Sequence, residues 1–123
     1  MARNSKVVGG GMSAGTVLSM VGDMQDNVTA AGTTQATAAL IYGDNVIITT
    51  AAASSGVIIG GPTFTPGDEM VIFNLGANTV LVYPPLGGII NALSANAGFS
   101  IAAGKSATLI ARSSVNFVAA ASA

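Results

Sequence analysis

The sequence contains no histidine, no cysteine and no tryptophan. Without histidine it lacks the side chain that most often transfers protons near neutral pH, and without cysteine it lacks thiol nucleophiles, disulfides and thiolate metal ligands. Charged residues make up 7% of the 123 residues, against about 25% in an average soluble domain. We therefore predict that the protein is not an enzyme and that it has no cofactor, no metal site and no small-molecule substrate.

Charge of either sign is also scarce. The four basic residues are too few for a surface that follows phosphates, so we expect no nucleic acid partner; they are Arg3, Lys6, Lys105 and Arg112. The five acidic residues are scattered, and we expect them at solvated turns rather than in a cation site; they are Asp23, Asp26, Asp44, Asp68 and Glu69.

Long hydrophobic runs are absent as well. The apolar stretch after the basic start "MARNSK" is interrupted by three glycines at residues 9–11. No segment reaches the roughly 18 uninterrupted apolar residues of a membrane span. We expect no membrane partner and no secretory signal, and we expect synthesis in a cytoplasm.

The sequence does contain many short apolar segments. They are rich in β-branched residues, are separated by Gly, Pro, Asn and Asp, and follow one another every 8–12 residues or so, as in sandwiches and barrels; they include "NVIITTAA", "GVIIG", "EMVIFNL", "NTVLVYP", "GFSIAAG", "SATLIAR" and "SVNFVAA". We predict a single all-β domain over residues 16–123, a small antiparallel β-barrel or jelly-roll sandwich, with its first strand at residues 16–22. Residues 1–15 are predicted to be a flexible N-terminal arm, and residues 23–35 a polar, turn-rich segment.

The segment "VIFNLGANTVLVYPP", residues 71–85, looks like two strands joined by a tight turn at residues 76–78. Both faces of these strands are apolar, whereas a sheet with one face in water alternates apolar and polar residues. The second apolar face, together with the low charge, predicts a homo-oligomer, which we take to be a trimer.

Two short motifs resemble catalytic or cofactor signatures. "GMSAG" at residues 11–15 matches the hydrolase pattern G-x-S-x-G, but the serine would need a histidine that the chain does not have. Gly9, Gly11 and Ala14 give a degenerate dinucleotide fingerprint without the strand–helix context that this motif requires. We interpret both as parts of a flexible Gly–Ser segment.

Residues 28–119 resemble small virion structural proteins of tailed bacteriophages. The similarity lies in "VTAAGTTQATA", the acidic turn "TPGDE", the segment "VIFNLGAN", "VYP" with its Gly-rich loop, "INAL", and a last strand with Phe117. The resemblance implies a capsid decoration (cement) protein on the outside of the head, with the major capsid protein as partner. The alternative is a tail- or fibre-associated β-domain that binds the host surface or another virion component. For the decoration protein, Arg3 and Lys6 are candidate residues of an arm that docks on the capsid.

Overall fold

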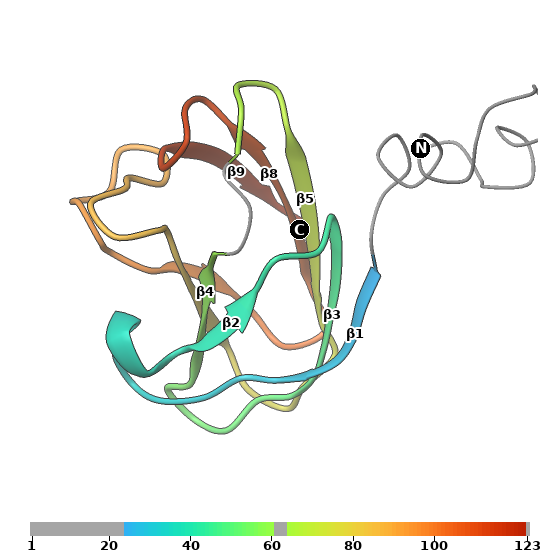
Figure 1. Cartoon of the computed structure of the whole chain (residues 1–123). Helices are drawn as coiled ribbons and strands as arrows, with labels where there is room; N and C mark the ends of the chain where they lie inside the picture. The colour runs from blue at the N-terminus through green and yellow to red at the C-terminus, as the bar shows by residue number, and fades with distance from the viewer. Residues whose placement is uncertain (1–23, 61–63, 123) are drawn as a thin grey trace, which may run out of the picture.

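The computed structural model describes residues 24–60 and 64–122 (Figure 1). Nine strands and one 3₁₀ turn, η1 (Gln35–Thr37), follow one another along this part of the chain. The strands are β1 (Met24–Thr29), β2 (Ala39–Ile41), β3 (Asn45–Thr50), β4 (Gly56–Ile59), β5 (Glu69–Asn74), β6 (Val80–Tyr83), β7 (Phe99–Ile101), β8 (Ser106–Ala111) and β9 (Phe117–Ala121). No helix in these residues has the length and hydropathy needed to cross a bilayer.

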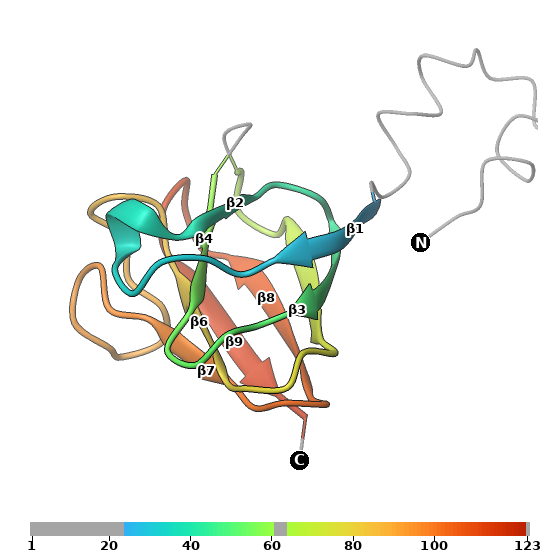
Figure 2. The ribbon, with the colours of Figure 1, turned by 90° about the horizontal axis from the view of Figure 1, so that it is seen from below.

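The strands form two open sheets that face each other (Figures 1 and 2). One sheet has five strands in the order β1-β3-β5-β8-β9, and the other has four in the order β2-β4-β6-β7. From β1 to β6 the chain alternates between the sheets, so β1, β3 and β5 pair in parallel, as do β2, β4 and β6. Parallel neighbours need a crossover, which is usually a helix; here a strand of the opposite sheet provides the return path.

The last three strands change the direction of pairing. β7 pairs antiparallel with β6, β8 with β5, and β9 with β8. Both sheets are therefore mixed, with a parallel first part and an antiparallel end.

The core lies between the two sheets and is made of aliphatic side chains. The five-stranded sheet contributes Val46, Ile48, Met70, Ile72 and Leu109, and the four-stranded sheet contributes Ile41, Val57, Ile59, Val80, Val82 and Ile101, all fully buried or nearly so. Phe64 and Phe117 pack edge to face with ring centroids 5.2 Å apart. Burial of these side chains, at about 25 cal/mol per Å² of apolar area, is the main force that holds the sheets together.

The all-β prediction is confirmed, and the seven apolar segments from "NVIITTAA" onward each contain a strand. The sheets differ from the predicted antiparallel barrel or jelly roll, because they are mixed and neither closes on itself. The polar segment at residues 23–35 was expected to be turns, yet it contains β1. The strand predicted at residues 16–22 and the arm at residues 1–15 lie outside the described residues.

The predicted hairpin at residues 71–85 is wrong. β5 and β6 lie in different sheets, so the bend at residues 76–78 carries the chain from one sheet to the other. Gly76 is needed there because of close packing rather than a positive φ: a Cβ on it would lie 2.7 Å from Ala51 Cβ and 2.8 Å from Ala51 N. Such distances are too short for a carbon atom without movement of the backbone.

Candidate functional site

The ionisable side chains of the described residues do not gather into a catalytic or metal site. No group of three His, Cys, Asp or Glu residues is close enough to hold a metal ion in this part of the chain. The Asp68 carboxylate accepts hydrogen bonds from the backbone N–H and the hydroxyl of Thr65, which is the turn role predicted for it. Asp26 instead lies in β1, where its carboxylate accepts the N–H of Asn27. Arg3 and Lys6, the predicted docking residues, fall outside the described residues.

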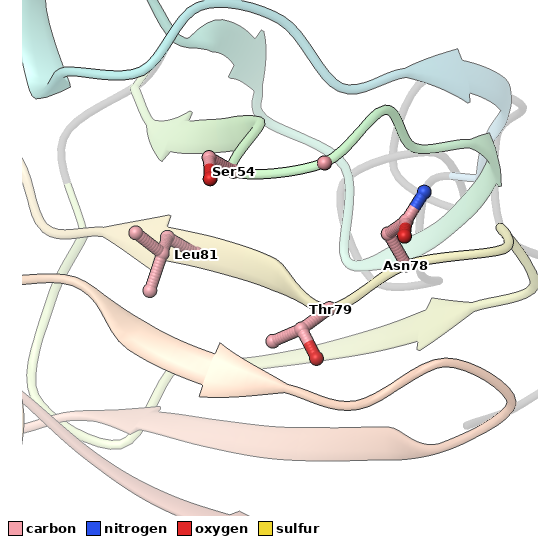
Figure 3. A pocket seen from close by; sticks show the side chains of 5 residues that line it. Ser54, Asn78, Thr79 and Leu81 are labelled. Atoms are coloured by element: carbon pink, nitrogen blue, oxygen red, sulfur yellow. The ribbon is translucent and has the colours of Figure 1, made fainter.

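A shallow depression of about 350 Å³ opens between the loop after β3 and the start of β6 (Figure 3). Its lining residues are Ala53, Ser54, Asn78, Thr79 and Leu81. The Asn78 amide already donates a hydrogen bond to Ala51 O at 2.9 Å. The lining offers hydroxyl groups but no carboxylate or amine, so it can form hydrogen bonds to a ligand but cannot supply an acid or a base.

The connection between β6 and β7, residues 84–98, is the most prominent loop, and we call it the long loop. Connections of this length without secondary structure are uncommon in compact domains and are often functional. Leu86, at its tip, is 78% exposed, and Ile89 and Leu93 of the same loop are also exposed. Ile90 points the other way and is fully buried, which anchors the loop to the core.

Side-chain amides form hydrogen bonds on either side of Leu86 and hold the long loop in shape. Asn96 Oδ1 accepts the N–H of Gly87 at 2.6 Å and an Nε2 hydrogen of Gln35 at 3.1 Å. Gln35 Nε2 also donates to Pro84 O at 2.9 Å. Gly87 and Asn96 both have positive φ, which Gly and Asn adopt at low cost. Leu86 is therefore an exposed apolar side chain on a loop with several internal and tertiary hydrogen bonds.

Two further amides tie the long loop to β9. Asn116 Oδ1 accepts the N–H of Ile89 at 3.0 Å. Asn91 pairs with both backbone groups of Ala119: its Nδ2 donates to Ala119 O at 3.1 Å, and its Oδ1 accepts Ala119 N–H at 2.8 Å. The Asn91 side chain thus takes the place of a neighbouring strand along the free edge of β9.

The free edge of β2 is closed in the same way. Ile41 O accepts the N–H of Gly60 on the β4 side, so Leu40 O and Tyr42 N–H point to the opposite, free side. Gln25 occupies that side, because its Nε2 donates to Leu40 O at 3.1 Å and its Oε1 accepts Tyr42 N–H at 2.9 Å.

The two remaining edges are unsuitable for strand addition for other reasons. β1 has register shifts around Val28 and a left-handed Asn27, which make its edge irregular. β7 is only three residues long. Short, irregular or covered edges are the usual means by which β-proteins prevent pairing with another chain.

The outward side of the five-stranded sheet has the opposite character. Ile47 lies opposite Phe73, Val71 opposite Thr108, and Ile110 opposite Val118. We name Ile47, Val71, Phe73, Ile110 and Val118 the apolar face. Phe73, Ile110 and Val118 are each 38–40% exposed, and Glu69 is the one ionisable residue in β3, β5, β8 and β9.

No protein-family model and no curated protein sequence matches this chain. The resemblance to virion proteins therefore stays a prediction from the sequence. The features that a function has to explain are the long loop with Leu86, the closed strand edges and the apolar face.

Proposed function

We propose that the protein is a capsid decoration (cement) protein of a tailed bacteriophage, which binds the outside of the head and stabilises contacts between major capsid subunits. In this proposal it acts mechanically, as a homotrimer on the surface of the virion, and catalyses no reaction. The N-terminal segment with Arg3 and Lys6 would contribute to docking on the capsid.

The long loop is the observation that supports the proposal most directly. An exposed leucine on a loop that is already ordered loses little conformational freedom when it enters a pocket on a partner. Burial of its apolar surface in that pocket would contribute about 25 cal/mol per Å² removed from water. A two-sheet sandwich with satisfied edges also suits a protein that must persist outside a cell, where binding to the capsid adds to its stability.

The proposal is tested on particles with and without the protein. Particles that lack it should release their DNA at a lower temperature, or in low salt with a chelator, and should still adsorb to the host. Purified particles should contain the protein in hundreds of copies. Particles that are equally robust but fail to adsorb would contradict the proposal and favour the tail- or fibre-associated alternative.

The role of the long loop is tested by Leu86→Asp, with Leu40→Asp as the matched control. Leu40 is also an exposed leucine, at 53%, but it lies on β2 of the other sheet. We expect Leu86→Asp to fold normally and to reduce occupancy on particles at least tenfold, because a charge cannot enter an apolar pocket without a partner. Equal occupancy of both variants would show that the long loop does not dock.

A further inference from the structure

The apolar face is not used by the attachment of the long loop. It spans four neighbouring strands, and its residues lie side by side in the registers that pair Ile47 with Phe73 and Ile110 with Val118. Leu75, just after β5, extends it, because its N–H donates to Ile48 O and continues the ladder. Leu75 is 61% exposed. Uncharged polar side chains share this side of the sheet, since Ser106 lies opposite Phe73 and Thr108 opposite Val71. An exposed apolar cluster of this kind commonly marks an interaction site.

We propose that the apolar face packs against the same face of other copies of this chain. The inference rests on the proposed homo-oligomer and names its contact surface. Association through faces rather than edges follows from the closed edges: Gln25 covers β2, Asn91 covers β9, β1 is irregular and β7 is short. A second copy therefore finds few free backbone groups to pair with, whereas the apolar face is open.

The charge of the face favours a second copy over a different partner. Glu69 lies at one end, opposite Ile110, and the remaining outward residues of β3, β5, β8 and β9 are apolar or uncharged. Two such faces meet without repulsion when the Glu69 side chains lie at the rim. A charged partner would find few groups to pair with, since Glu69 is the one charge on these four strands and the exposed Asp26 lies on the neighbouring β1.

The size of the face predicts how strong the contact is. Four strands, each about 4.8 Å wide and about 20 Å long, give a flat area on the order of 400 Å². A standard stable interface buries about 800 Å² on each partner. We therefore expect association that depends on concentration in solution and is complete on the particle, where neighbouring docking sites raise the local concentration. In a threefold arrangement all three faces point toward the axis, so each copy contacts one neighbour with one half of its face and the other neighbour with the other half.

The test is analytical ultracentrifugation of the full chain over a wide concentration range. The wild type should shift from monomer to an oligomer as concentration rises. Phe73→Glu and, independently, Val118→Lys should weaken self-association at least tenfold, and Leu40→Glu, the control on the other sheet, should behave like the wild type. Circular dichroism and thermal melting check that each variant is folded.

The inference is overturned if both folded variants associate like the wild type, or if the wild type is monomeric at all concentrations and cannot be cross-linked into oligomers on particles. Failure of the proposed function is distinguishable. In that case the protein self-associates through Phe73 and Val118, yet its removal leaves the particles unchanged. Conversely, if the protein stabilises particles while bound as separate monomers, the proposed function holds and the proposed contact is wrong.

Discussion

The five-stranded sheet has a β9 edge whose backbone groups are hydrogen-bonded and an apolar face whose side chains are partly exposed. Along β9, the Asn91 amide pairs with both free backbone groups of Ala119, so the edge offers little to another chain. Across the face, Phe73, Ile110 and Val118 are left more than a third exposed. The difference shows that a chain with few charges can block one mode of association with neutral amides while leaving another open.

The amides also act inside the domain, and there the largest effect is expected. Asn74 is fully buried, and its Nδ2 donates to Asn78 O and Ile101 O while its Oδ1 accepts Gly76 N–H. Asn74→Ala leaves all three groups without this partner, which should lower the free energy of unfolding by about 3–5 kcal/mol. Chemical denaturation measures the loss.

The control for Asn74 is Asn45→Ala. Asn45 lies on the outward side of β3 and is only half-buried, so its loss should change stability by less than about 0.5 kcal/mol. If the two variants lose the same free energy of unfolding, the buried hydrogen bonds of Asn74 do not stabilise the fold more than the half-buried Asn45 does.

A second prediction concerns the crossing between the sheets. Gly76→Ala should cost about 1–3 kcal/mol, because the new methyl group would overlap Ala51. Gly76→Asn should be at least as harmful, although asparagine tolerates a positive φ. Thermal melts of both variants check this, with Ala77→Ser as a neutral control. Rescue by asparagine would indicate a left-handed turn instead of close packing.

The edge of β9 should give a smaller effect. Asn91 has φ 55°, so Asn91→Gly keeps the backbone conformation and removes only the amide. We expect a loss of about 1 kcal/mol and a greater tendency to aggregate, since Ala119 is uncovered. Light scattering at raised temperature measures aggregation. Ser94→Gly, in the same loop, controls for flexibility and should aggregate like the wild type.

The sequence predicts the strands well where apolar and β-branched residues alternate with Gly, Pro and Asn. β1 was missed because Asp26 and Asn27 look like turn residues, and a register shift breaks its pattern. The pairing of the strands was also missed, because alternation of apolar and polar residues shows which side of a strand is buried but not which strands lie next to it. The nearly continuous apolar runs of β3 and β4 are typical of parallel strands and were the available signal.

The candidate site was less accessible from the sequence. Gln25, Asn91 and Asn96 look like ordinary polar residues until folding brings them to Leu40, Ala119 and Gly87, respectively. Leu86 did have a local signal, since a leucine between Pro85 and Gly87 is an apolar residue within a turn. The two apolar faces of the strand around Phe73 correctly indicated an apolar outward surface. We propose above that other copies of the chain cover it.

The side-chain amides have a further consequence for the conditions that the protein tolerates. An amide bears no charge in acid or in base, and its hydrogen bonds are not screened by salt as ion pairs are. The two buried polar residues of the described chain, Ser55 and Asn74, do not ionise either. We expect the melting temperature to change little when sodium chloride is raised from about 10 mM to about 150 mM, because screening acts on ionic contacts and not on these amide hydrogen bonds. Calorimetry at the two salt concentrations measures the change, and a drop of many degrees would show that ionic contacts hold the fold.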